Sequence, residues 1–307
     1  MPISKEPRIF GNVTELVSNP DGWKRDHLKY KIDRSVYIGG NPHVRKNHLP
    51  EELVIPLHEA WQFTKNHRPI DFNGSKVAVQ RLSLTDGILD ISGVTTDYFT
   101  LRGLPEAAKK TFQEYQDEIV INKSTKPEDA IFETTRPAGI CTHNVAVTSN
   151  GEIIMMVRSQ RQGFHEGKVS VSEEEQTELT DNSPFATSSR SYKEELNIKV
   201  SQKNISMLGV GVEKNTAYMA LAYIADSGHT AKKLAEKWYS AQDHDENTAI
   251  FAVPTETIDQ WLNKEKIGSS IWHSSLLAGK IHPDASLILH DTSPWRINLV
   301  KEFLLNN

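Results

Sequence analysis

Residues 144–198 read NVAVTSNGEIIMMVRSQRQGFHEGKVSVSEEEQTELTDNSPFATSSRSYKEELNI, and this stretch decides the fold of the chain. Its first part alternates apolar and polar residues on both sides of Asn150-Gly151, a pattern that predicts a β-hairpin. An acid-rich loop follows, and then a helix from about Ser183 to Leu196, where Ser183-Pro184 suits a helix start. A hairpin that leads into a carboxylate loop and a carboxylate helix is suited to holding a divalent metal against a diphosphate.

The segments on either side of this stretch predict a mixed α/β fold. Upstream, the pattern predicts a helix over 49–65, a second hairpin around Asp86-Gly87 and a helix over 105–115. Downstream, it predicts strands over 205–212, 216–225 and 248–253, and helices over 230–239, 257–263, 283–289 and 298–305. From residue 140 onward the order β-β-α-β-β-α-β-α places helices on both sides of one sheet.

The composition divides the chain into two parts. Residues 116–137 are polar and contain two prolines, Pro127 and Pro137, which suits a connector. We therefore predict an N-terminal α+β subdomain over 1–137, with a helix and a β-hairpin, and a second α/β domain over 138–307.

Composition also limits the function. The chain has 307 residues, a formal net charge of −5 and 24% charged residues, so it lacks the basic character that binding to nucleic acid or to an anionic membrane requires. Cys141 is the single cysteine, which excludes an intramolecular disulfide and favours a core role over a nucleophilic one. The N-terminus MPISKEPRIF has no signal-peptide pattern, and no apolar run is long enough to span a membrane, so a cytoplasmic location is expected.

A signature of spaced glycine, glutamate and arginine residues lies within the deciding stretch. Gly167 and Glu173 satisfy the pattern G-x5-E. Arg190, Glu194, Glu195 and Ile198 satisfy part of the pattern R-E-U-x-E-E-x-G-U, in which U is a bulky aliphatic residue. Together these positions resemble the signature of the Nudix hydrolase superfamily, and the resemblance implies an α/β/α sandwich that cleaves nucleoside diphosphate derivatives.

The chain departs from that signature at three places. Sixteen residues, 174–189, separate Glu173 from Arg190 where the signature has seven, and a longer surface loop of this kind has little entropic cost. Asn197 replaces the closing glycine, a mild change because asparagine also adopts the left-handed conformation that ends helices. Ser191 replaces the first helix glutamate, which removes a carboxylate from the face that Glu195 shares.

The resemblance also implies the site residues and the metal. Glu194 and Glu195 would be catalytic and would bind Mg²⁺ or Mn²⁺, with further ligands from Glu173, Glu174 and Glu246. Gapped similarities extend to the divergent Nudix proteins that cleave uridine diphosphate sugars, including Trp61, Thr96–Phe99, Met207–Val210 and Glu246–Phe251. The expected ligand is therefore a small nucleotide derivative, with a nucleotide sugar as the specific expectation.

Four further residues are candidates for substrate binding. Arg158 and Arg161 follow the second hairpin strand and can reach a phosphate. Arg190 can do the same, or it can pair with Glu194 and support the loop. Tyr98 can stack on a nucleobase, although aromatic residues at strand ends more often lie in the core.

Two other functions remain open at this stage. Ser191 and the lost glycine also suit a catalytically silent Nudix-fold module that binds a nucleotide or a protein partner, because a fold can outlast its chemistry. The Glu194-Glu195 pair also suits a solvated helix face in a structural protein without a ligand. The sequence leaves the general base, the oligomeric state and the pathway unassigned.

Overall fold

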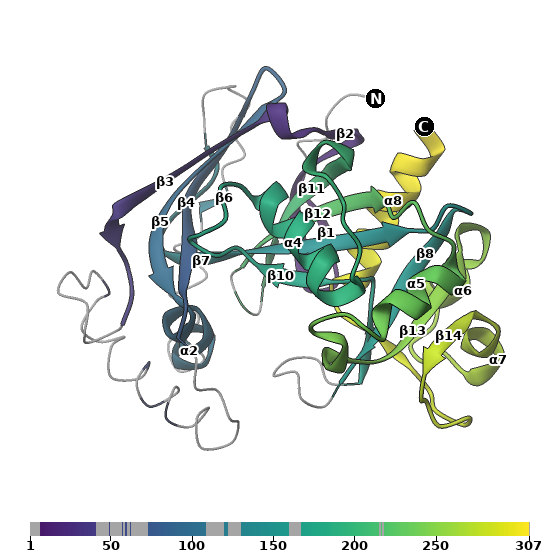
Figure 1. Cartoon of the computed structure of the whole chain (residues 1–307). Coiled ribbons are helices and arrows are strands. Elements are labelled where there is room, and N and C mark those ends of the chain that lie inside the picture. The colour runs from purple at the N-terminus through teal and green to yellow at the C-terminus, as the bar shows by residue number, and fades with distance from the viewer. Residues whose placement is uncertain are drawn as a thin grey trace.

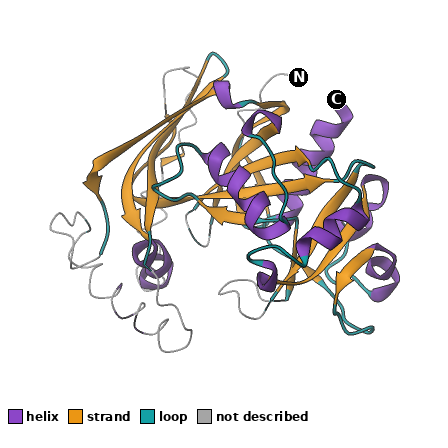
Figure 2. Cartoon of the chain, viewed as in Figure 1, coloured by secondary structure: helices purple, strands orange, loops and turns teal. Residues whose placement is uncertain are grey.

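The computed structural model describes residues 7–40, 49, 57, 59, 62, 73–108, 120–121, 130–159, 167–214, 216 and 218–306. In this part of the chain the strands form a large mixed sheet with helices on both sides (Figures 1 and 2). Most of the predicted helix 49–65, including Trp61, lies outside the described residues, as do Arg161 and the end of the predicted helix 105–115. No helix among the described residues is long and apolar enough to cross a membrane.

The elements follow one another as strands interrupted by short helices. The strands are β1 (Arg8–Phe10), β2 (Val13–Trp23), β3 (Leu28–Tyr37), β4 (Ser75–Thr85), β5 (Ile88–Asp97), β6 (Val120–Ile121), β7 (Ala130–Val147), β8 (Glu152–Arg158), β9 (Lys168–Ser170), β10 (Glu174–Gln176), β11 (Ile205–Glu213), β12 (Met219–Asp226), β13 (Asn247–Pro254), β14 (Leu276–Gly279) and β15 (Ile288–Leu289). The helices are α2 (Tyr98–Ala108), α4 (Pro184–Leu196), α5 (Ala231–Trp238), α6 (Asp259–Leu262), α7 (Ser269–Trp272) and α8 (Ser293–Asn306).

Strand β7 connects the two halves of the sheet, as Figure 1 shows. Its first half pairs with β4 in the antiparallel direction, through Ala78↔Gly139 among others, and β4 forms the predicted hairpin with β5. Its second half pairs in parallel with β12. Because β7 runs without a break through residues 137 and 138, the predicted domain division falls inside a strand, and β2 of the N-terminal part pairs with β11 of the C-terminal part. The division into 1–137 and 138–307 stays a prediction.

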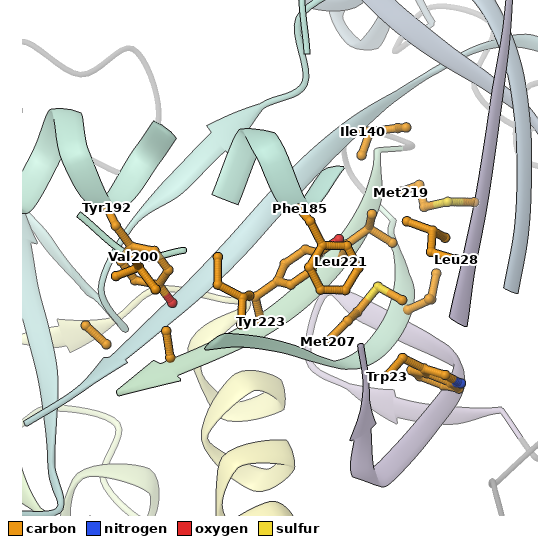
Figure 3. Close-up of a cluster of buried hydrophobic side chains, with 14 of the residues drawn as sticks. Trp23, Leu28, Ile140, Phe185, Tyr192, Val200, Met207, Met219, Leu221 and Tyr223 are labelled. Atoms are coloured by element: carbon orange, nitrogen blue, oxygen red, sulfur yellow. The ribbon is translucent and has the colours of Figure 1, made fainter. Parts of the chain in front are cut away.

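Two hydrophobic cores lie on opposite faces of the sheet, as the α/β/α prediction requires. Along β12 the odd-numbered residues Met219, Leu221 and Tyr223 join one core, whereas Ala220, Ala222 and Ile224 join the other. The first core is covered by α4 and α5 through residues such as Phe185, Tyr192 and Trp238, and Figure 3 shows Phe185, Leu221 and Tyr223 packed together in it. The second is covered by α8, α6 and α7. The period-two alternation of a strand explains this division, and the predicted fold class is confirmed.

One predicted helix is wrong. Residues 283–289 form a turn followed by β15, which pairs in parallel with β9 through Ile288↔Lys168 and Leu289↔Val169. The backbone of buried Leu287 exchanges hydrogen bonds with Ile267 at 2.7 and 2.9 Å. Partners distant in the sequence therefore override the local pattern that predicted a helix.

Candidate functional site

Helix α4 begins and ends at the residues that the sequence indicates. The Ser183 hydroxyl accepts a hydrogen bond from the backbone N–H of Ala186 at 3.2 Å, and Pro184 follows in the first turn. At the other end Asn197 adopts the left-handed conformation, with φ 52° and ψ 38°. An asparagine can therefore close this helix where the signature has glycine.

The acid-rich segment lies between two strands that separate from each other. Strands β7 and β8 pair at Val147↔Ile153, next to the turn. Farther along, the N–H of Asn144 donates to the carbonyl of Glu173 at 2.9 Å, and the N–H of Ser172 donates to the carbonyl of Ile154 at 3.1 Å. The segment thus takes the place of a neighbouring strand, and Glu173 is completely buried.

The side chains of the three consecutive glutamates, 173–175, point to two different sides of the acid-rich segment. Glu175 lies 3.4 Å from Arg190 of α4, and the charge of Glu173 acts on Glu195 of the same helix. Glu174 points elsewhere and lies 2.5 Å from Arg296 of α8. Because successive side chains of an extended chain alternate in direction, this division follows from the strand conformation of the segment.

We call Glu173, Glu175, Glu195 and Glu246 the acidic site. Burial, followed by the negative charges of Glu246 and Glu173, raises the pKa of Glu195 well above its usual range, while Arg158 opposes that rise. Burial likewise raises the pKa of Glu173 to about 8 and that of Glu175 to about 7. The four carboxylates thus come from three separate segments and repel one another when ionised.

Several features of the acidic site suit a cation. Both carboxylate oxygens of Glu173 are buried and have no hydrogen-bond partner. Glu195 is 6% exposed, and its Oε2 accepts a hydrogen bond from the Asn247 side chain at 3.3 Å. Across the described residues, however, no three His, Cys, Asp or Glu side chains are grouped as ligands of one ion. The donor chemistry therefore fits a hard divalent cation, while the side chains are not drawn together around one point.

Arg190 supports the loop and the helix at the same time. Its guanidinium donates to Glu194 at 3.0 Å, to Asp181 at 3.0 Å and to the carbonyl of Gln176 at 3.2 Å. Glu194 is thus held in an ion pair within its own helix. This contact matches the interpretation in which Arg190 pairs with Glu194 and supports the loop. Its predicted roles as catalyst and metal ligand stay predictions.

Ser191 lies one helical turn before Glu195 and is also buried. It is 0% exposed, and its hydroxyl has no hydrogen-bond partner. A glutamate at this position would add a further carboxylate to the buried face of α4 that carries Glu195. Serine at this position therefore adds no negative charge beside the acidic site.

Glu174 belongs to a second buried group, which we call the Arg296 cluster: Glu174, Arg296, His143, His290 and Glu213. The pKa of Glu174 lies well below its usual range despite burial, because His290, Arg296, His143 and Arg158 favour its charged form. The His143 ring lies 3.0 Å from Glu213 and 3.7 Å from Glu174. The carboxylate of Glu174 thus has partners of its own, so we leave it out of the proposed metal-ligand set.

The predicted substrate-binding residues lie in different places. Arg158, at the end of β8, lies 3.4 Å from Glu174 and also acts on Glu195, so it lies between the Arg296 cluster and the acidic site. Tyr98 begins α2 and acts electrostatically on Tyr218, whose hydroxyl accepts a hydrogen bond from Gln176 at 3.1 Å. Cys141 is buried, and burial raises the pKa of its thiol, in agreement with a core role.

Sequence reasoning did not single out two residues that the structure brings to these groups, and it did not separate Glu175 from the neighbouring acids of the run 173–175. Strand alternation would have paired Glu175 with Glu173. Asn247 contacts Glu195 from β13, 52 positions away along the chain. Arg296 contacts Glu174 across 122 positions, and no local pattern marks either of these two residues.

The raised pKa values of the acidic site predict that stability falls as pH rises. An unfolded glutamate loses its proton near its ordinary pKa of 4.5, whereas folded Glu173, with a pKa of about 8, keeps its proton to higher pH. Between these values the folded state binds more protons, so the free energy of unfolding decreases with increasing pH. A thermal denaturation series from pH 5 to pH 8.5 without metal should show this decrease. The decrease in the free energy of unfolding across this pH range should be smaller by a few kcal/mol in Glu173→Gln than in the native protein. Equal decreases in the two proteins would contradict the burial of an ionisable Glu173.

Comparisons with known proteins give similarity to solved structures alone. No protein-family model and no curated protein matches the chain. A MutT/nudix family protein from Enterococcus faecalis is 12% identical with a TM-score of 0.28, over 47% of this chain and 50% of that one. A MutT protein from Methanosarcina mazei Go1 is 19% identical with a TM-score of 0.28, over 41% and 83%. A Nudix hydrolase from M. Smegmatis, RenU, is 10% identical with a TM-score of 0.31, over 55% and 86%.

The likeness thus extends to about half the length of the first of these proteins. All three TM-scores lie below 0.5, so the similarities carry no argument about activity, substrate or metal. The functional argument rests instead on the residues of the acidic site.

Proposed function

We propose that the protein is a metal-dependent hydrolase that cleaves the diphosphate of a nucleoside diphosphate derivative, specifically a nucleotide sugar. The observation that carries this proposal is the acidic site. Glu173 and Glu195 are buried, and the pKa of Glu195 is raised both by burial and by its charged neighbours Glu246 and Glu173. Buried carboxylates that repel one another bind a divalent cation favourably, because the cation offsets their charge.

Glu195, Glu173 and Glu246 would hold the cation, with Glu175 beside them. Carboxylate oxygens are the ligands that Mg²⁺ and Mn²⁺ prefer. Glu195 lies on α4, and Glu173 lies in the acid-rich segment before it. Glu246 directly precedes β13, and its backbone carbonyl accepts a hydrogen bond from the N–H of Ser159 at 2.8 Å. When bound, the metal supplies charge neutralisation of the diphosphate and orientation of the attacking water.

The remaining roles fall to side chains around the acidic site. Arg158 is 14% exposed and reaches toward Glu195, which suits it to pair with a phosphate oxygen of the substrate. Glu175 is 22% exposed, and its pKa of about 7 is close to the pH at which a general base works best. We therefore propose Glu175 as the group that accepts the proton of the attacking water.

The nucleotide-sugar substrate is supported by the sequence resemblance to proteins that cleave uridine diphosphate sugars. The alternative is a silent module that binds a nucleotide without cleaving it. Ser191 favours this alternative, because its buried hydroxyl is neutral where the signature has a carboxylate. Both possibilities predict that the protein binds a nucleotide derivative, and only the hydrolase predicts that the protein cleaves it.

A substrate panel tests the proposal. The purified protein is incubated with Mg²⁺ or Mn²⁺ and with nucleotide sugars, dinucleotides and nucleoside triphosphates, and nucleoside monophosphate products are separated by chromatography. We expect metal-dependent cleavage of at least one nucleotide sugar, faster than of any triphosphate, and no product in the presence of EDTA.

The Ser191→Glu variant separates the alternatives. If the native protein is silent and Ser191→Glu gains metal-dependent cleavage, the site is of the expected kind but the native hydrolase proposal is wrong. If neither protein cleaves any member of the panel, the hydrolase proposal fails altogether.

A further inference from the structure

A cavity of about 310 Å³ lies beside β3, and we call it the β3 pocket; none of the acidic-site carboxylates is among the residues that line it. Strand β3 forms one wall, Val77 of β4 contributes, and residues 179–182 of the segment before α4 close it. The Arg34 guanidinium donates a hydrogen bond to the carbonyl of Leu179 at 3.1 Å, which fastens the segment to β3. The walls of the pocket therefore come from both parts of the chain.

The inner surface of the β3 pocket suits a flat ring with polar edges. Ile32, Val77 and Leu179 provide aliphatic surface. Asn182 adds an amide that can both donate and accept hydrogen bonds. A nucleobase presents the matching features, which are two apolar faces and an edge of donors and acceptors.

Tyr30 provides the second indication of a ligand. It lines the β3 pocket, and its hydroxyl is buried without a hydrogen-bond partner. Such a hydroxyl costs free energy until a partner reaches it. Burial raises the pKa of this hydroxyl, Asp181 raises it further and Arg34 lowers it, and both of these charged residues also line the pocket.

Of the three charged residues that line the β3 pocket, two are cations, in a chain whose net charge is −5, and the third, Asp181, is paired with Arg190. Lys31 and Arg34 line it, and both are exposed to solvent. Two cations beside an apolar surface are suited to a ligand that joins a ring to an anion. A mononucleotide has this composition, and 310 Å³ is near the lower limit of about 300–1,000 Å³ for ligand pockets.

Asp181 connects the β3 pocket to the acidic site. It lines the pocket, and its carboxylate accepts a hydrogen bond from Arg190 at 3.0 Å. The same guanidinium lies 3.4 Å from Glu175. One arginine side chain therefore spans the interval between the pocket and the acidic site.

We propose that the β3 pocket binds the nucleoside end of the substrate, with the base against Ile32 and Leu179 and the phosphates directed past Lys31 toward the acidic site. The identity of this ligand as a substrate rests on the proposed function. Binding in the pocket itself involves none of the acidic-site carboxylates and needs no metal.

Calorimetric titration in EDTA tests this proposal. The probes are the common nucleoside monophosphates, the corresponding nucleosides and inorganic phosphate. We expect at least one monophosphate to bind, its nucleoside to bind about tenfold more weakly, and phosphate alone to give no measurable heat.

Three variants locate the bound nucleotide. Lys31→Ala should weaken monophosphate binding about tenfold, whereas Lys29→Ala, an exposed lysine of the same strand outside the pocket, should leave it unchanged. Tyr30→Phe should weaken binding and also raise the melting temperature, because it removes a buried hydroxyl without a partner. A purely structural role for Tyr30 would change the melting temperature alone.

The outcomes separate this proposal from the proposed function. Absence of nucleotide binding in EDTA, or equal affinities in the native protein, Lys31→Ala and Tyr30→Phe, would overturn the pocket assignment. Metal-dependent cleavage with an unchanged KM in those variants would leave the hydrolase in place while the pocket assignment fails. Metal-free binding that depends on Lys31 and Tyr30, without any turnover, would support the pocket and contradict the hydrolase.

Discussion

Replacing Arg296 by methionine is expected to lower the free energy of unfolding by about 3–5 kcal/mol, because it removes one partner of a buried ion pair. Arg296 is 0% exposed, and its guanidinium donates to the carbonyl of Val171 at 2.8 Å and to Glu174 at 2.5 Å. Methionine fills a similar space but donates no hydrogen bond, so Glu174 loses a principal counter-charge in the interior. Urea denaturation measures the change from the midpoint and slope of unfolding.

Lys301→Met is the matched control on the same helix. Lys301 pairs with Asp259 at the surface, where the two side chains are 33% and 56% exposed, so its loss should change stability by no more than about 0.5 kcal/mol. A similarly small effect of Arg296→Met would show that the Arg296 cluster does not anchor the segment that carries Glu173 and Glu175.

Glu195→Gln is expected to reduce metal-dependent turnover by about 100-fold or more. A bound metal contributes several kcal/mol to the transition state, and each 1.36 kcal/mol corresponds to a factor of ten in rate. Glutamine has the same shape and can still accept the hydrogen bond that Asn247 donates to Glu195 at 3.3 Å. The fold should therefore persist, and stability at pH 8.5 should increase, because a buried charge that Glu246 and Glu173 oppose is gone.

Glu236→Gln serves as the control for the loss of one carboxylate. Glu236 of α5 is 51% exposed and pairs with Lys233 at 2.8 Å, away from any role in the acidic site. Its replacement should leave both turnover and stability nearly unchanged. Turnover in Glu195→Gln equal to that of Glu236→Gln would exclude Glu195 from catalysis.

The sequence was sufficient to predict the parts of the fold that depend on local chemistry. The limits of α4 were predictable from Ser183, Pro184 and Asn197, because capping involves residues within one turn of a helix end. The hairpin at Asp86-Gly87 was predictable in the same way, and both residues have the positive φ that its turn requires, 51° and 78°.

Features that depend on distant partners could not be predicted in this way. Leu287 and its neighbours form strand structure because Ile267 and β9 pair with them, which the local pattern does not indicate. The connector expected over 116–137 contains the start of β7, because β4 pairs with that segment. The separation of Glu174 from Glu173 and Glu175 also required the structure, since the Arg296 cluster assembles from four separate segments.

Manganese binding measured by electron paramagnetic resonance tests the acidic site most directly. Native protein at pH 8.5, where the carboxylates are more fully ionised, should bind Mn²⁺, and Mg²⁺ should displace it. Affinity should fall as pH decreases below about 8, the pKa of the proposed ligand Glu173, and Glu195→Gln should bind at least tenfold more weakly than Glu236→Gln. No binding by the native protein, or equal affinity in the two variants, would contradict the assignment of a metal site to these glutamates.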